Sequence, residues 1–139
     1  MEMLLASFMT DATPLDPPAI KDEKEVHPIA CEWRAMLREV VMRFARRDYD
    51  LEGGIVGVEP VSPETAQHIR GSVEDYGATL IELPEEAWQT SISQWSGTHW
   101  NILLDLWTAE EGPSDLVLGG RITESEFGPR LSIHMVYVP

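Results

Sequence analysis

The residues of this chain best suited to chemistry are four carboxylates at the junction of two predicted strands. They are Asp105, Glu110, Glu111 and Asp115. Clustered carboxylates can form the acid pair of a glycosidase or bind a divalent cation, although the spacing here matches no calcium-binding loop. The structural alternative is that they accept hydrogen bonds from turn amides or pair with arginines. A third interpretation is an acidic surface that binds a basic partner.

Tryptophans surround this acidic stretch, at positions 88, 95, 100 and 107. Trp100 and Trp107 are seven residues apart on one predicted strand, so they face opposite sides of the sheet. At least one of them points away from the helix that covers the sheet. It faces a partner, the N-terminal arm, or a small second core with Trp88 and Trp95. Asp105 lies on the same side as Trp107 and needs a hydrogen-bond partner if that side is buried.

Other kinds of catalytic or metal site have little support in the sequence. None of the four histidines lies three to five residues from another, and Cys31, the single cysteine, completes no zinc quartet. His134 is interpreted as a structural residue that points opposite to Ile133 and Met135 on the last predicted strand. No serine has the flanking glycines of a hydrolase elbow, and no lysine follows Lys24 to form a Schiff base or hold a phosphate. We therefore predict no catalytic residue, no metal and no cofactor.

The charge of the chain favours basic partners. Ten basic residues oppose 24 acidic ones, which gives a net charge of −14. Such a surface repels nucleic-acid phosphates and anionic membranes, and it also keeps a protein soluble. The charge is uneven, because residues 27–47 hold five arginines against two acids while the rest of the chain is acidic.

The chain is expected to be a cytoplasmic protein. One cysteine allows no internal disulfide, which suits a reducing compartment. No apolar run reaches the roughly 18 residues that a membrane span needs. The first residues are apolar but lack the basic start of a secretory signal.

Two helices are predicted before the strands. Apolar residues recur at three- and four-residue spacing from Pro28 to Arg47, so that Trp33, Leu37 and Phe44 share one helical face. A second helix begins at Ser62-Pro63-Glu64 and ends at Gly77. Residues 1–26 are rich in proline and charge and are predicted to be a flexible or docking arm, and residues 27–139 to be one domain.

Short apolar runs after residue 78 predict strands at 79–83, 90–95, 101–108, 115–123 and 131–138, and a further short strand is predicted at 55–58. The connections are too short for crossover helices, so the sheet is antiparallel. Gly119-Gly120 is expected to form a bulge or bend within a strand. The predicted fold is α+β, with the first helix laying its apolar face on a curved, cone-like antiparallel meander.

One stretch in the second half of the chain resembles a family of small bacterial proteins without an assigned function. The matching residues are Asp75-Tyr76-Gly77, Leu80, Leu83-Pro84, Trp88, Trp95, Trp100, Asp105-Leu106-Trp107-Thr108, Glu110-Glu111-Gly112 and Ser114-Asp115-Leu116. The resemblance covers residues 28–139 and implies a bacterial, cytosolic origin. It transfers no catalytic residue. Pro113 stands where the pattern has a basic residue, which removes one partner for the neighbouring acids.

We predict from these features an acidic, non-catalytic binding protein, such as an immunity-type inhibitor that masks a basic effector. Its contact residues are predicted to be Trp95 and Trp107 with the four acids at 105–115. The alternative is a small-molecule enzyme or binder with a pocket between helix and sheet, in which Asp105, Tyr49 or His134 acts as acid or base. A third interpretation is a structural subunit that forms homo-oligomers through the apolar residues 1–10.

Overall fold

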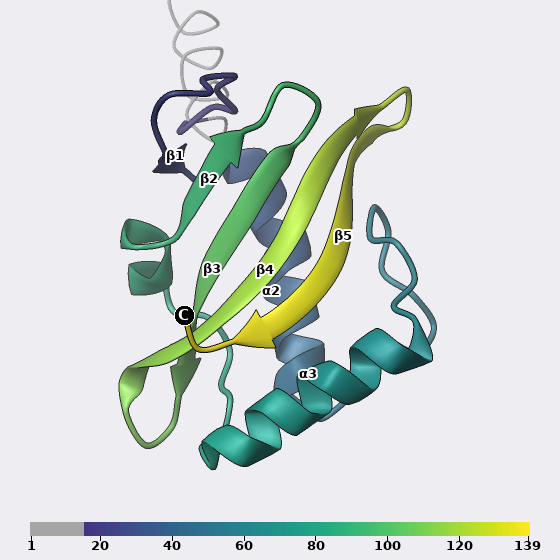
Figure 1. The fold of residues 1–139 in the computed structure, drawn as a ribbon, viewed down its shortest axis with the longest axis vertical. Coiled ribbons are helices and arrows are strands. Elements are labelled where there is room, and N and C mark those ends of the chain that lie inside the picture. The colour runs from purple at the N-terminus through teal and green to yellow at the C-terminus, as the bar shows by residue number, and fades with distance from the viewer. Residues whose placement is uncertain (1–15) are drawn as a thin grey trace, which may run out of the picture.

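The computed structural model describes residues 16–139, and the predicted apolar segment of residues 1–10 lies outside them. The described chain is an α+β fold with two longer helices before most of a five-stranded antiparallel sheet, in the order β1-β2-β3-β4-β5 (Figure 1). The fold class predicted from the sequence is therefore confirmed. The elements are β1 (His27–Pro28), α2 (Cys31–Ala45), α3 (Pro63–Tyr76), the short 3-10 helix η2 (Glu85–Gln89), β2 (Ile92–Trp95), β3 (Trp100–Thr108), β4 (Gly112–Ser125) and β5 (Gly128–Tyr137).

Helix α2 packs across one face of the sheet because its apolar residues form a single stripe. Trp33, Leu37 and Phe44 on this stripe are at most 1% exposed, and burying each contributes about 1.5–3 kcal/mol. The Trp33 ring lies 4.8 Å from that of Trp100 on β3. Core side chains therefore fill most of the space between α2 and the sheet, where the sequence predicts a small-molecule pocket as the alternative. A hollow of about 160 Å³ remains at the N-terminal end of α2, where Glu32 and Trp33 face Trp100 and the β4–β5 turn.

Helix α3 starts and stops at the predicted signals. Ser62 caps its N-terminus by accepting a hydrogen bond from the Thr65 amide at 3.1 Å, and Pro63 occupies the first turn. Gly77 ends it in the left-handed conformation, with a φ of 81°. Figure 1 shows α3 beside the lower end of β5, and it buries Ile69 and Val73 there.

The strands differ from the prediction mainly at their limits. β1 pairs with β2 at His27 and Pro28, where the start of the first helix was predicted, and α2 begins at Cys31. The predicted strand at 55–58 contributes only an isolated parallel bridge from Val58 to Leu131. Residues 16–26 of the predicted arm lie against the domain, where the Trp100 indole donates to the Ile20 carbonyl at 2.9 Å.

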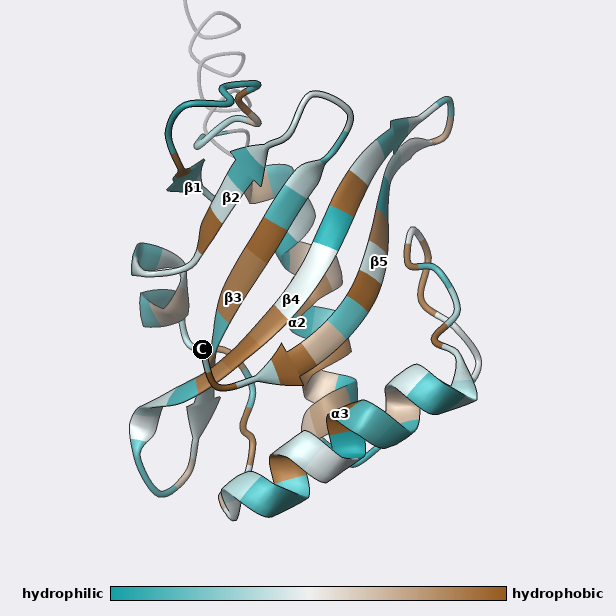
Figure 2. Ribbon diagram, viewed as in Figure 1, coloured by the Kyte–Doolittle hydropathy of each residue, from teal (hydrophilic) through white to brown (hydrophobic). Residues whose placement is uncertain are grey.

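The register of the sheet places its residues in rows. Even-numbered residues of β3 face α2 and are buried, whereas odd-numbered ones face the other side. Figure 2 shows a hydrophobic run along the middle of β3, where the strand is apolar on both faces. At Gly119–Gly120 the pairing with β5 shifts by one residue, which is the predicted bulge.

Candidate functional site

The face of the sheet opposite α2 is not covered by either longer helix of residues 16–139, and we call it the open face. Figure 1 shows α2 behind the sheet and α3 beside it, so that neither helix lies over this face. Residues paired across the strands form rows on this face. From the β2–β3 turn downward in Figure 1, the rows are Gln94, Asn101, Arg121 and Ser132; then Ile92, Leu103, Gly119 and Met135; then Asp105, Val117 and Tyr137; and finally Trp107 with Pro113. The first, upper row is polar, whereas the second and third rows, which we call lower rows together with the fourth, are largely apolar.

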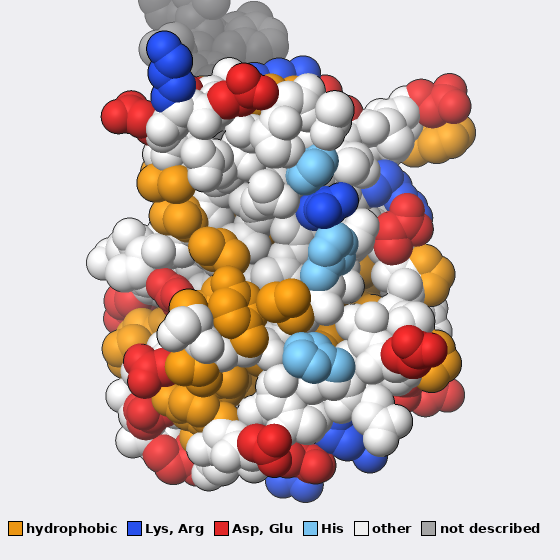
Figure 3. All heavy atoms as spheres, viewed as in Figure 1, with side chains coloured by type: hydrophobic (Ala, Val, Ile, Leu, Met, Phe, Trp, Pro, Cys, Tyr) orange, Lys and Arg blue, Asp and Glu red, His pale blue; other side chains and the backbone are white. Residues whose placement is uncertain are grey.

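Apolar side chains are concentrated on the lower rows of the open face. Leu103 is 38% exposed and Met135 41% exposed. Figure 3 shows a band of hydrophobic side chains that crosses this face of the molecule. An antiparallel sheet with one face in solvent normally alternates to polar residues on that side, and this band departs from that pattern.

The bulge in β5 alters the predicted orientation of one residue. Because β5 has an extra residue opposite Gly119–Gly120, both His134 and Met135 are exposed, while Ile133 is buried. His134 and Met135 together line one hollow of about 220 Å³ on the open face, so they do not point to opposite sides. Burial, and then the neighbouring Arg121 charge, lower the pKa of His134. It is therefore neutral at pH 7.

Two of the four predicted acids serve the structure of the hairpin between β3 and β4. Glu110 accepts hydrogen bonds from the Thr79 amide at 2.8 Å and the Thr79 hydroxyl at 3.0 Å, and the backbone bond is the main reason that its pKa is lowered. Glu111 accepts a hydrogen bond from the Tyr76 hydroxyl at 2.6 Å, which raises the pKa of that phenol. These bonds fix the turn against the end of α3 and the loop after it.

The other two acids differ in that their carboxylates are unbonded within the described chain. The carboxylates of Asp105 and Asp115 make no hydrogen bond or ion pair with another residue of 16–139, although the Asp115 amide donates to the Tyr76 hydroxyl at 3.1 Å. Asp105 is half-buried on the open face, between Leu103 and Trp107. Its side of the strand is therefore not the core.

The structure separates the two predicted contact tryptophans. Trp95 pairs with Trp100 at one end of β3, with ring centroids 4.6 Å apart, and the Lys21 ammonium lies 4.9 Å from its ring. Trp107 lies at the opposite end of β3, half-buried, with its ring against Gly112. Trp107 thus shares the open face with Asp105, whereas Trp95 belongs to the cluster on the other side of the sheet.

Trp33, Trp88 and Trp100 are all under 5% exposed. Trp88 packs beneath the guanidinium groups of Arg34 and Arg38, at 5.1 and 5.4 Å from its ring. Its indole nitrogen is the one buried side-chain polar atom in residues 16–139 without a hydrogen-bond partner. These three indoles are core residues.

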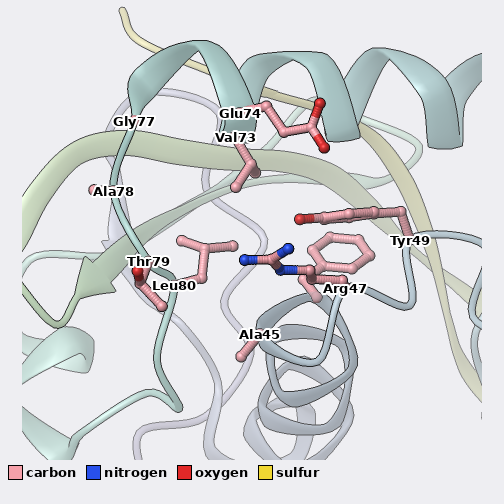
Figure 4. A pocket seen from close by; sticks show the side chains of 10 residues that line it. Ala45, Arg47, Tyr49, Val73, Glu74, Gly77, Ala78, Thr79 and Leu80 are labelled. Carbon is pink, nitrogen blue, oxygen red and sulfur yellow. The ribbon is translucent and has the colours of Figure 1, made fainter.

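A second hollow, of about 270 Å³, lies between the C-terminal ends of α2 and α3 (Figure 4). Arg47, Tyr49 and Glu74 line it together with apolar residues. The sequence suggests Tyr49 only as an acid or base in a pocket between helix and sheet, whereas the structure places it in this hollow. One signal for this hollow in the sequence is Arg47, the second residue after α2. It occupies the position that follows the C-cap, where glycine is usual.

Within residues 16–139, no three histidine, cysteine, aspartate or glutamate side chains are grouped so that they could hold a metal ion. None of the helices described for these residues is both long and apolar enough to cross a membrane.

Comparison with known proteins identifies a family but no activity. No curated protein and no solved structure shows a significant match to this chain. A family model described as a domain of unknown function, DUF7668, matches residues 41–139, a span that includes α3 and all of β2 to β5. Because this match covers more than half of the chain, the protein belongs to the DUF7668 family.

Proposed function

We propose that this protein is a non-catalytic binding protein that holds a basic protein partner on the lower rows of its open face. The observation that carries the proposal is the combination of an apolar sheet face with two carboxylates that have no partner in residues 16–139. Leu103, Met135 and Trp107 provide the apolar centre, Asp105 lies within it, and Asp115 lies in the irregular stretch of β4 between Pro113 and Val117. Such a centre of aromatic and methionine side chains with a charged rim is the usual anatomy of a protein interface.

Charge complementarity supports a basic partner. The chain carries a net charge of −14, and the hairpin end of the open face adds Glu110 and Glu111 to the two unpaired acids. Arg121 is the one basic side chain in the four rows named above, and Arg130 in the next row of β4 and β5 is paired with Glu59. An acidic field of this kind raises the association rate with a cationic protein and loses strength as salt is added.

The specific role that we propose is inhibition of a basic effector, as an immunity-type protein would do. Enzymes that act on nucleic acids bind phosphates through lysines and arginines, so their working surfaces are basic. A protein that places acids and an apolar sheet face on such a surface blocks access of the substrate. This role requires no catalytic residue in the chain.

The experiment is to mix the protein with basic nucleases encoded by the same genome and to measure cleavage of DNA and RNA. We expect one of them to lose activity in proportion to the added protein, with weaker inhibition as the salt concentration rises. If every nuclease cleaves at its full rate in the presence of excess protein, the inhibitor role is wrong.

A pair of variants locates the contact surface. Leu103→Lys places a positive charge at the centre of the open face and is expected to weaken inhibition by at least about tenfold. Val56→Lys makes the same chemical change at a residue that is 95% exposed in the loop before α3, and it should leave inhibition unchanged. Equal inhibition by the two variants would place the contact away from the open face. Urea unfolding of both variants checks that each is folded.

A further inference from the structure

The hollow between the C-terminal ends of α2 and α3 lies apart from the open face and has the chemistry of a ligand site. Phe44, Val73 and Leu80 provide apolar walls, and the polar groups of Arg47 and Tyr49 face its interior (Figure 4). We propose that it binds a small organic molecule that carries one carboxylate on an apolar body. Pockets for small ligands commonly combine apolar walls with a few converging polar groups.

The backbone of Arg47 is in a left-handed conformation that favours glycine over arginine. The amide of Arg47 donates to the Phe44 carbonyl, and that of Asp48 donates to the Arg43 carbonyl, both at 2.9 Å. These two bonds form the Schellman motif that ends α2, and they hold Arg47 at a φ of 66°. Glycine is the usual residue here, since a Cβ disfavours this left-handed conformation. The arginine is therefore explained by its side chain.

The guanidinium of Arg47 is not paired with a carboxylate of the described chain. The residue is exposed, and it has no carboxylate within ion-pair distance in residues 16–139, whereas Arg43 on α2 binds both Glu39 and Asp48. Figure 4 shows the Arg47 guanidinium lying in the hollow beside the hydroxyl of Tyr49. An arginine that crosses a hollow without a protein partner is well suited to a carboxylate ligand.

Tyr49 adds a second donor at the same place. Its side chain packs on Phe44 with ring centroids 5.7 Å apart, and the residue is only 5% exposed. Its hydroxyl makes no hydrogen bond to another residue of the described chain. Burial raises the pKa of this phenol, so it remains a neutral O–H donor at pH 7. One carboxylate can accept hydrogen bonds from both Arg47 and Tyr49.

Glu74 limits the class of ligand. It lines the hollow from α3, and Figure 4 shows its carboxylate on the α3 side, above the Tyr49 hydroxyl. A second negative charge on a ligand would be repelled by Glu74, and the apolar walls would exclude a polar body. The preferred ligand is therefore a monocarboxylate of about the size of an amino acid.

The test titrates the full chain with each of three related compounds and monitors binding through the NMR shifts of the backbone amides. We expect 4-methylpentanoate to bind with a Kd in about the millimolar range or below and to shift the amides around Arg47 and Thr79. Its amide, which lacks the charge, and 3-methylglutarate, which carries a second charge, should bind at least about tenfold more weakly. No saturable shift with 4-methylpentanoate, or equal binding of its amide, would overturn the proposal.

Variants assign the binding to the named residues. Arg47→Gly removes the guanidinium and suits the left-handed backbone, so the protein should remain folded and bind 4-methylpentanoate at least about tenfold more weakly. Arg46→Gln is the control, since it removes the same charge from an exposed neighbour outside the hollow and should change the Kd less than about twofold. Glu74→Gln should bring the affinity for 3-methylglutarate close to that for the monocarboxylate. Unchanged binding by Arg47→Gly would refute the site.

Discussion

The glycine at the bulge of the sheet allows a quantitative prediction about strand packing. Gly120 on β4 pairs with Ile133 on β5, next to the extra residue His134. A Cβ at position 120 would lie 2.6 Å from the carbonyl oxygen of Ser132. This separation is too short for a carbon and an oxygen that are not bonded, so one of the two must move. Because this oxygen belongs to the backbone, relief requires β5 to shift. We expect Gly120→Ala to lower the free energy of unfolding by about 1–3 kcal/mol, the usual range for overpacking in a core.

Two other glycines provide matched controls for the same substitution. Gly119→Ala would bring a Cβ to 3.3 Å from Cγ of Met135, an exposed side chain that can rotate away, so the loss of stability should be smaller. Gly71 lies within α3, where a Cβ would meet nothing within 4 Å outside its own stretch of helix. Gly71→Ala should therefore raise stability, by up to about 1 kcal/mol, because alanine is the better helix former.

Urea unfolding followed by tryptophan fluorescence measures all three variants. The urea concentration at the midpoint should be highest for Gly71→Ala, lower for wild type, lower again for Gly119→Ala and lowest for Gly120→Ala. The slopes of the unfolding free energy against urea should be similar. If Gly120→Ala unfolds at the wild-type midpoint, the close approach of β4 and β5 at the bulge does not exclude a side chain, and the reasoning fails.

Three further predictions concern helix α3 and the hairpin it contacts. Ser62→Ala removes the acceptor for the Thr65 amide and should cost about 1 kcal/mol in urea unfolding. Tyr76→Phe removes two hydrogen bonds to the hairpin and should cost about 1 kcal/mol in the same assay, with the helix content by circular dichroism unchanged. The lowered pKa of Glu110 contributes stability that is complete above its ordinary pKa of 4.5 and is lost as pH falls through the lower folded value. Glu110→Gln should therefore lose less stability than wild type between neutral pH and about pH 3, and equal losses would show that its bonds to Thr79 do not depend on the charge.

The sequence predicted those parts of the fold that depend on local pattern. The stripe that includes Trp33 and Phe44 defined the buried face of α2, and the Ser62-Pro63 signal marked the start of α3. The adjacent glycines at 119 and 120 indicate the bulge from the sequence of β4 alone. Each of these features is decided by residues within a few positions of one another.

The parts that could not be predicted depend on pairing between distant residues. Asp105 and Trp107 are two residues apart on β3, so the sequence places them on the same side of the strand. Because the strand is apolar on both faces, only the position of α2 decides which side is core. Trp95 belongs with Trp100 because β2 and β3 pair as they do. The hollow around Arg47 combines residues from 44 to 80, and no local pattern specifies that they meet.

Both edges of the sheet are occupied along part of their length, and this limits how another protein can be recognised. β1 pairs with β2 on one side. On the other side, the amides of Glu59 and Leu131 form hydrogen bonds at 2.8 Å that join the loop before α3 to β5. An incoming strand finds these stretches of backbone already bonded, so it cannot extend the sheet there. Along these stretches, recognition by added backbone pairing is excluded, and contact there has to use side chains instead.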